Sequence, residues 1–196
     1  MTAFRNLAIY CGSATPGDPS YMELARAVGT ELARRGIGVV YGGGHRGLMG
    51  AVADAAMQAG GAVTGIIPRA LVSAEVAHSA ITRLEIVETM HERKARFTDL
   101  SDGFITLPGG VGTMDELWEA VSWAQLGYHT KPVGLLNVNG FYDQLLAFNR
   151  HMIDVGFIRP DHAGIIVARE TLDDLLDAMA AYRPHRTIFA MKAEDL

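Results

Sequence analysis

The chain has 196 residues, of which 49% are hydrophobic and 20% are charged, and this balance excludes an intrinsically disordered protein. Its formal net charge of -5 argues against general binding to nucleic acid or to an anionic membrane. Cys11 is the single cysteine, so an internal disulfide and a cysteine metal cluster are excluded, and a reducing, cytoplasmic setting is expected. We expect one domain over residues 1–196, without a signal peptide or a membrane-spanning run.

Apolar runs alternate with amphipathic or alanine-rich segments along the whole chain. The apolar runs predict strands over residues 7–11, 37–41, 62–67, 82–87, 103–107, 132–138 and 164–168. The other segments predict helices over residues 21–35, 48–59, 90–100, 116–124, 141–155 and 172–182. Ser20 is the expected N-cap of the first helix. Strands that alternate with helices imply an α/β fold, a doubly wound parallel sheet with helices on both faces.

Three glycine-containing turns follow predicted strands and supply candidate ligand-binding residues. They contain Gly12 and Ser13, then Gly43 and Gly44 within residues 42–47, then residues 108–116. Because ligands bind beyond the carboxyl ends of parallel strands, we expect these turns to form one pocket. No acidic residue ends the predicted strand after the second turn, where the ribose of a dinucleotide would be bound, so a dinucleotide is disfavoured and a mononucleotide stays open.

The third turn, PGGVGTMDE over residues 108–116, joins a buried strand to a helix. Its three glycines are expected to permit positive φ and a close approach of the backbone to a ligand. Unpaired backbone N–H groups and the helix dipole at a helix start favour a phosphate. A structural role is equally open for two of its residues, since Thr113 and Glu116 have the spacing of a capping box.

A second candidate region is the helix that begins after Thr89, its expected N-cap, with Glu92 in the capping-box position. Met90, Arg93 and Lys94 are expected to share one face of this helix. The two adjacent cations could bind a phosphate or hold a carboxylate in place. A solvated basic patch is the more frequent outcome for such a pair and stays open as the alternative.

Glu116 is the candidate catalytic carboxylate. A carboxylate close to a bound phosphate is electrostatically unfavourable, because like charges repel, so a functional role must account for it. Cleavage of an N-glycosidic bond supplies one, since a carboxylate can stabilise the oxocarbenium-like ribosyl centre or activate water. Glu75, in a mixed segment over residues 69–80, is another carboxylate, although a solvated side chain is its ordinary interpretation. The histidines show no metal-ligand spacing, and the glycine turns carry no Walker A lysine.

The PGGVGTMDE turn, together with MHERK from residue 90, resembles the Lonely Guy (cytokinin riboside 5'-monophosphate phosphoribohydrolase) family. Older descriptions often call such sequences lysine decarboxylases. CGS near the start, YGGGHRGLMG in the second turn and SWAQLG after the third extend the resemblance over nearly the whole chain. It implies a Rossmann-like fold, a homodimer or larger assembly, and hydrolysis of N6-modified adenosine 5'-monophosphates to the free base and ribose 5-phosphate. No metal or redox cofactor is required by these roles.

The resemblance implies that Arg93 and Glu116 are the catalytic residues. Joined with the turn residues, it gives an expected substrate-binding set of Gly12, Ser13, Gly43, Gly44, Glu75, Met90, Lys94, Gly109, Gly110, Val111, Gly112, Thr113, Met114, Asp115 and Ser122. The chain departs from the common family pattern at Val111, where tyrosine is frequent, and at Asp115, where many members have glutamate. Ser122 stands where many members have threonine, which keeps the hydroxyl.

Two other functions stay open. One is a general AMP or purine nucleotide nucleosidase, which would use the same residues with a different pocket for the base. The other is a nucleotide or cofactor carrier, which would bind without turnover and would not need both Arg93 and Glu116. A lysine decarboxylase is disfavoured, because neither Lys94 nor Lys131 has the context of a pyridoxal phosphate lysine. The expected partners are a nucleoside 5'-monophosphate and a second copy of the chain, with no nucleic acid and no membrane.

Overall fold

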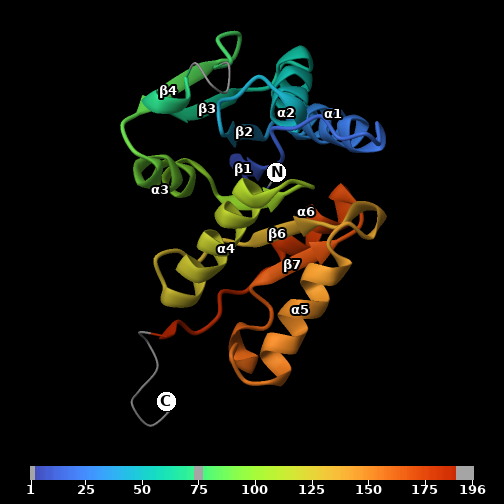
Figure 1. The fold of residues 1–196 in the computed structure, drawn as a ribbon, viewed down its shortest axis with the longest axis vertical. Helices are drawn as coiled ribbons and strands as arrows, with labels where there is room; N and C mark the ends of the chain where they lie inside the picture. Colours follow the sequence, from blue (N-terminus) through green and yellow to red (C-terminus); the bar gives the residue numbers. More distant parts are fainter. Residues whose placement is uncertain (1–2, 73–76, 189–196) are drawn as a thin grey trace.

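The computed structural model describes residues 3–72 and 77–188. Within them, seven parallel strands form one sheet in the order β4-β3-β2-β1-β5-β6-β7 (Figure 1). The strands are β1 (Asn6–Tyr10), β2 (Gly38–Tyr41), β3 (Val63–Pro68), β4 (Arg83–Val87), β5 (Gly103–Thr106), β6 (Val133–Leu136) and β7 (Ile166–Arg169). The predicted doubly wound parallel sheet is therefore confirmed, and each predicted strand end lies within two residues of the observed one.

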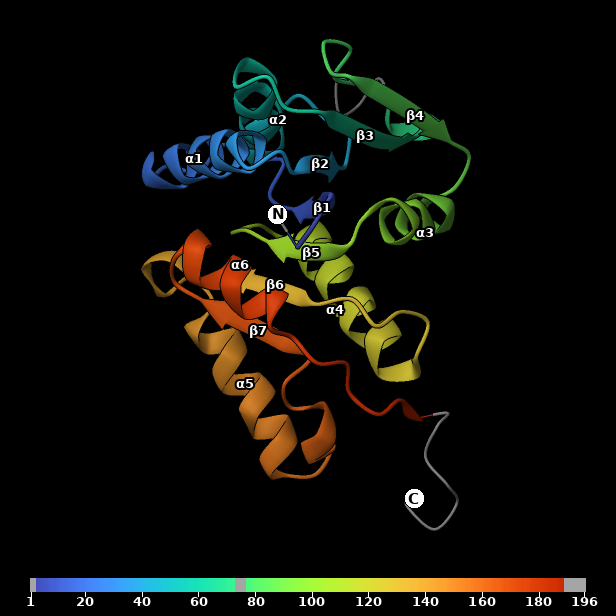
Figure 2. The same cartoon turned by 180° about the vertical axis from the view of Figure 1, so that it is seen from behind.

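Six α-helices cover the sheet in the described part of the chain. They are α1 (Ser20–Arg34), α2 (Gly47–Gln58), α3 (Met90–Leu100), α4 (Val111–Leu126), α5 (Asp143–Asp154) and α6 (Leu172–Ala180). Short 3-10 turns are η1 (Arg69–Leu71), η2 (Val138–Gly140) and η3 (Pro160–His162). One hydrophobic cluster joins one face of the sheet to α1, α2 and α6, and a second joins the other face to α3, α4 and α5 (Figure 2).

The sheet is buried on both faces because its strands carry apolar residues at successive positions. In β1, Leu7 and Ile9 enter the first hydrophobic cluster, whereas Ala8 and Tyr10 enter the second. This alternation is the two-residue period of a strand, and near-continuous apolar runs are typical of parallel sheets covered on both sides. In the described ranges, no helix combines the length and the hydropathy needed to cross a bilayer.

The starts of three helices differ in how well the sequence predicts them. The capping box at α3 is confirmed, since Thr89 Oγ1 accepts from the Glu92 N–H at 3.1 Å and Glu92 Oε2 accepts from the Thr89 N–H at 3.4 Å. The expected N-cap of α1 is wrong: Ser20 is the first helical residue, and Pro19 precedes it without a side-chain cap. The capping box expected at Thr113 is also wrong, because α4 already begins at Val111.

The crossover connections diverge at β1, which pairs with β2 on one side and with β5 on the other. Such a switch point leaves a crevice at the carboxyl ends of the two central strands. Backbone hydrogen bonds tie the turns together there: the Gly12 N–H donates to Pro108 O at 3.2 Å, and the Leu48 N–H donates to Gly12 O at 3.0 Å. The structure thus brings the three glycine-containing turns to one place, as their positions after strands predict.

Candidate active site

A pocket of about 210 Å³ opens at the switch point, between the turn after β1 and the start of α4. The residues that line it come from the turn after β1, from α2 and α3, and from the start of α4 with the glycine before it. They are Cys11, Gly12, Ser13, Ala14, Met49, Arg93, Gly110, Val111, Gly112, Thr113 and Glu116. Both expected catalytic residues are therefore in one cavity with most of the third turn.

The glycines of the third turn leave space for neighbouring atoms or a ligand and are not needed for a positive φ. None of the turn's glycines has a positive φ, so that part of the expectation is wrong. A Cβ on Gly109 would lie 2.1 Å from Thr113 Oγ1 and 2.8 Å from Gly12 N, so this position has no room for a side chain. At Gly110 and Gly112 a Cβ would meet nothing within 4 Å. The protein's own packing does not require these two glycines, and their missing side chains leave space in the pocket.

Arg93 is buried in the protein, with a relative exposure of 4%. Its Nε donates to Ile66 O and its NH2 donates to Gly42 O, both at 3.0 Å. The guanidinium also lies over the Phe97 ring, 5.5 Å from the centroid. The alternative of a solvated basic patch is therefore wrong for Arg93, because two strand-end carbonyls and a ring fix its orientation.

Glu116 faces Arg93 across the pocket. Its Oε1 lies 3.7 Å from Arg93 NH1, and its side chain is 14% exposed. The guanidinium supplies the opposite charge that a largely buried carboxylate needs. Burial raises the pKa of the Cys11 thiol, and the nearby charge of Glu116 raises it further. Cys11 is thus a neutral thiol in the pocket wall, as expected for a buried small residue.

Lys94 points away from Arg93 and connects two helices. Its Nζ lies 2.9 Å from Asp115 Oδ2 and 3.2 Å from Glu119 Oε2, so α3 and α4 are joined by two ion pairs. Burial lowers the pKa of Lys94, but the hydrogen bonds to the two carboxylates outweigh it and raise that pKa. Adjacent helical residues point in different directions, which is also why Asp115 and Glu116 have different partners.

The structure leaves several expected binding residues outside the lining of this pocket. Met114 packs against the hydrophobic cluster below α4, and Ser122 is exposed further along that helix. Gly43 and Gly44 are buried beside the segment that follows residue 76, where the His78 N–H donates to Gly43 O at 2.9 Å. Met90, Lys94, Gly109 and Asp115 are also absent from the lining, although Gly109 borders a neighbouring pocket. Glu75 lies outside the described residues.

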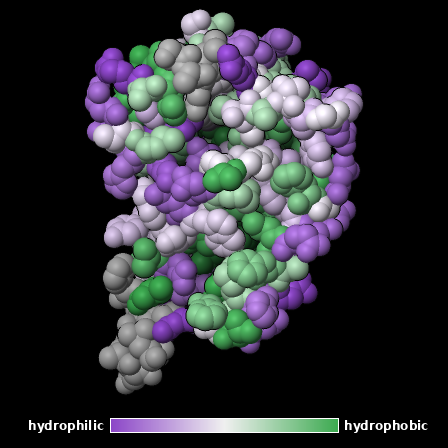
Figure 3. All heavy atoms as spheres, viewed as in Figure 1, coloured by the Kyte–Doolittle hydropathy of each residue, from purple (hydrophilic) through white to green (hydrophobic). Residues whose placement is uncertain are grey.

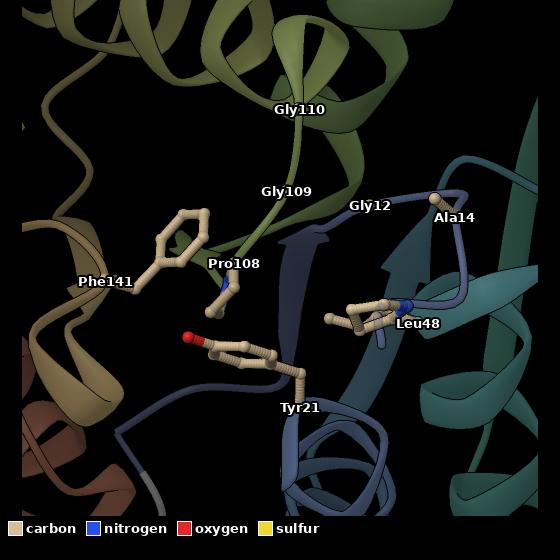
Figure 4. Close-up of a pocket in the computed structure, with 9 residues that line it drawn as sticks. Gly12, Ala14, Tyr21, Leu48, Pro108, Gly109, Gly110 and Phe141 are labelled. Carbon is tan, nitrogen blue, oxygen red and sulfur yellow. The ribbon is translucent and has the colours of Figure 1, made fainter. Parts of the chain in front are cut away.

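That neighbouring pocket is apolar and has a volume of about 180 Å³. It shares Gly12, Ala14 and Gly110 with the first pocket. Tyr21, Leu48, Pro108 and Phe141 project into it from four segments (Figure 4). Pro108 belongs to the predicted third turn, but Tyr21, Leu48 and Phe141, and Met49 in the first pocket, were not expected, because each lies in a predicted helix as an ordinary apolar residue. The positions of Leu48 and Met49 just after a glycine-rich turn were the available signal.

Comparisons with known proteins agree with the family resemblance seen in the sequence motifs. The profile of a family described as "Possible lysine decarboxylase" matches residues 49–179. The chain is 46% identical over 181 residues to the cytokinin riboside 5'-monophosphate phosphoribohydrolase LOG of Oryza sativa subsp. japonica, which covers 92% of this chain and 75% of that protein. It is 45% identical over 181 residues to the phosphoribohydrolase LOG7 of Arabidopsis thaliana, with 92% and 83% covered.

Solved structures share the fold at low sequence identity. A molybdenum cofactor carrier protein from Chlamydomonas reinhardtii has a TM-score of 0.65 and 18% identity, over 88% of this chain and 94% of its own. A molybdenum cofactor binding protein from Rippkaea orientalis has a TM-score of 0.64 and 19% identity, over 90% and 95%. At 18–19% identity these similarities support a shared fold and do not indicate a shared function.

The parallel sheet and the pocket at its switch point define a Rossmann-like α/β protein. Within that class, the extent of the two sequence matches is decisive. The chain belongs to the Lonely Guy family of cytokinin riboside 5'-monophosphate phosphoribohydrolases, which confirms the resemblance indicated by the PGGVGTMDE and MHERK motifs.

Proposed function

We propose that this protein hydrolyses the N-glycosidic bond of N6-modified adenosine 5'-monophosphates, releasing the free base, a cytokinin, and ribose 5-phosphate. Relatives with 45–46% identity carry the name of this activity. The observation that carries the proposal is the pair formed by the buried Arg93 and the largely buried Glu116, 3.7 Å apart in the wall of the switch-point pocket. A protein that only binds a nucleotide has no need to bury a carboxylate beside its anionic ligand.

The start of α4 is the proposed phosphate site. Backbone N–H groups of the first helical turn have no intrahelical partners, and the helix dipole adds partial positive charge. Gly110 is the residue before the helix, and Gly112 lies in its first turn. Because a Cβ at either position would point into open space, a phosphate can approach the backbone there.

Glu116 is proposed to act at the ribose. The bond between the anomeric carbon and the base nitrogen breaks, and its electron pair leaves with the base. The carboxylate stabilises the resulting positive charge on the ribosyl carbon and orients the attacking water. The water's hydroxyl joins the anomeric carbon, and its proton ends on the departing base. Arg93 holds Glu116 in place, since its own orientation is fixed by Ile66 O and Gly42 O.

The apolar pocket beside the site bears on the choice of base. It offers about 180 Å³ next to the residues that both pockets share, and its walls include the Tyr21 and Phe141 rings. An apolar N6 substituent would be removed from water there. This favours N6-modified adenosine monophosphates over AMP, although a general AMP nucleosidase remains the alternative that uses the same catalytic pair.

The family description as a possible lysine decarboxylase finds no support in the site. That chemistry needs a lysine to carry pyridoxal phosphate. Lys94 is engaged by Asp115 and Glu119, and Lys131 Nζ donates to Thr98 O. Among the described residues that line the two pockets, none is a lysine.

The proposal includes a cytoplasmic homodimer that does not bind nucleic acid. The net charge of -5 and the single, buried cysteine support the setting and the lack of nucleic-acid binding. A groove between α3 and α4 supports the dimer. We call the residues that line it the α3–α4 groove: His91, Ala95, Thr98, Asp99, Trp123 and Tyr128. Aromatic residues of this kind are enriched in protein–protein interfaces.

The proposed activity is tested by measuring base release from AMP and from N6-isopentenyladenosine 5'-monophosphate. We expect the wild-type protein to free the base, and faster from the modified nucleotide. Glu116→Gln and Arg93→Ala should each lower the rate by at least about a hundredfold, since each removes charge at the reacting centre. Glu23→Gln, which neutralises an exposed carboxylate on α1, should retain the wild-type rate.

A wild-type protein that binds AMP but cleaves neither nucleotide would refute the enzyme and point to a carrier. Equal rates on both nucleotides would favour the general nucleosidase. Retained activity in Glu116→Gln would remove the carboxylate from the mechanism.

A further inference from the structure

Two histidines and one carboxylate from three separate segments meet beside the second glycine turn. His45 belongs to that turn, Asp54 to α2, and His78 to the segment before β4. One imidazole nitrogen from each histidine and one carboxylate oxygen all lie within 4.8 Å of one another. The spacing of these residues in the sequence matches no metal-binding motif, so the cluster is visible only in the folded chain.

His78 holds a buried nitrogen that its protein neighbours do not satisfy. The residue has a relative exposure of 2%, and its Nδ1 lies 3.0 Å from the Tyr41 hydroxyl. Its Nε2 is 3.2 Å from Asp54 Oδ1, yet it makes no hydrogen bond of acceptable geometry. A buried polar nitrogen without a partner is destabilising and needs an explanation.

The other two members leave the cluster accessible from solvent. His45 is exposed, and its ring stands at 88° to the His78 ring with 4.3 Å between the centroids. Asp54 is about half exposed. An ion arriving from solvent would therefore meet two solvent-accessible ligands, His45 and Asp54, and one buried ligand, His78.

We propose that His45, Asp54 and His78 form a binding site for one divalent transition-metal ion of the zinc class. Two imidazoles and one carboxylate are a preferred donor set for Zn²⁺, which takes a tetrahedral arrangement completed by water. Tyr41 acts as the outer-shell partner that orients the His78 ring.

The ion would fasten one segment of the chain to another. Gly44 and Ala77 already form an isolated antiparallel bridge, and the His78 N–H donates to Gly43 O. The preceding residue, Gly42, accepts the hydrogen bond from Arg93 NH2. None of the three ligands lines the switch-point pocket. The proposed role is thus structural: the metal clamps the turn on which the orientation of Arg93 depends.

The test is titration of the chelator-treated full chain with Zn²⁺ by isothermal calorimetry. We expect one ion per chain and a melting temperature that rises with Zn²⁺ concentration. Loss of an outer-shell partner costs about 10–100-fold in affinity, so His45→Ala and Asp54→Asn should each cost at least about a hundredfold. Tyr41→Phe, which removes the hydroxyl that orients the His78 ring, should lower the affinity for Zn²⁺ by about 10–100-fold. His151→Ala, an exposed histidine on α5, is the matched control and should bind Zn²⁺ as the wild type does.

The replaced ligands His45 and Asp54 are at the surface, so their variants should fold, and circular dichroism checks this. Substitution of Co²⁺ adds a spectroscopic readout, because a tetrahedral site gives intense visible absorption and an octahedral aqueous ion does not. The proposal is overturned if the wild type takes up no stoichiometric zinc, or if His45→Ala and Asp54→Asn bind it with wild-type affinity. Neither readout depends on nucleotide hydrolysis, so the two proposals fail or stand separately.

Discussion

The orientation of Arg93 depends on a glycine 51 positions earlier in the chain. Gly42 O accepts from Arg93 NH2, and a Cβ on Gly42 would lie 2.2 Å from that same nitrogen and 3.0 Å from Met49 Sδ. This glycine is required by the space that the guanidinium occupies. Gly42 is therefore sensitive to the addition of even one methyl group, although it contacts no substrate in the proposed mechanism.

We expect Gly42→Ala to lower the rate of base release by about a hundredfold, because a displacement of about 1 Å in a positioning group has costs of that size. The protein should stay folded by circular dichroism, since Arg93 can move toward the pocket. Gly17→Ala is the control, because a Cβ there would meet nothing within 4 Å. A Gly42→Ala protein with the wild-type rate would show that the Arg93 position tolerates this shift.

At the scale of single residues, the sequence indicated which side chains take part in the site but not how deeply they are buried. The motifs identified Arg93 and Glu116 as partners, and the structure places them 3.7 Å apart. The sequence did not show that Arg93 is buried, because surface is the usual place for an Arg-Lys pair and nothing local indicates that the carbonyls of Ile66 and Gly42 point at it. Such contacts arise from the pairing of strands far apart in the sequence.

Among the elements, α4 carries the site at its start and is anchored at its end by His129. The helix stops at Gly127, whose φ of 93° is in the left-handed region. His129 is buried, its Nε2–H donates to Ala120 O at 3.0 Å, and its Nδ1 accepts from the Lys131 N–H at 3.2 Å. The second hydrogen bond requires the neutral ring, because Nδ1 of a protonated ring carries a hydrogen and cannot accept. Burial lowers the pKa of His129 to about 4.

This arrangement predicts acid sensitivity with a defined direction. The His129 pKa is about 4 in the folded chain and about 6.5 when unfolded, so the unfolded chain takes up a proton first as the pH falls. His129 should lower the free energy of unfolding by about 2 kcal/mol between pH 7.5 and pH 5. Urea unfolding of the wild type beside His129→Gln measures this: the variant should lose less stability over that interval.

His151→Gln is the control for that measurement, because His151 is exposed and its replacement should leave the pH dependence unchanged. If His129→Gln shows the full wild-type loss between the two pH values, the acid sensitivity originates elsewhere.

Helices and strands were predicted correctly where the hydrophobic pattern was strong. Their predicted boundaries were less accurate where a glycine-rich turn adjoined the element. Buried strands such as β5 and β6 were found because apolar runs are continuous there. The predicted start of α4, Glu116, lies five residues after the observed start, Val111, because the glycines of this segment are typical of a turn. That shift converted Thr113 and Glu116 from an expected cap into residues that face the pocket.

At the scale of the whole molecule, two apolar surfaces compete as the proposed dimer contact. One is the α3–α4 groove, with Tyr128 69% exposed and Trp123 edge-on to both Tyr128 and His91. The other lies over α5 and the turn after it, where Phe148, Val155 and Phe157 are exposed; Figure 3 shows apolar atoms over the lower end of this helix. The groove adjoins α3 and α4, which carry the catalytic pair, so we favour it.

We expect Tyr128→Lys to convert the dimer into a monomer, because a charge at the centre of an aromatic contact loses the burial that holds it together. Phe157→Lys, which changes an 85% exposed side chain on the other surface, should leave the dimer intact. Light scattering after size exclusion gives the mass of each. A monomeric wild type would refute the dimer, and the reverse pattern between the variants would move the contact to α5.

The position of β5 between β1 and β6 has a consequence for synthesis of the chain. A ribosome that has released only residues up to β4 has delivered four strands, and the edge of β1 that later pairs with β5 is then bare. An unpaired edge at what becomes the centre of a sheet invites association with other chains. Glu116 lies in α4, the helix that follows β5, so the catalytic pair also cannot form until this part of the chain has been delivered. Closure of this edge of β1 and completion of the Arg93–Glu116 pair therefore depend on one continuous segment of the chain, β5 with the α4 helix after it.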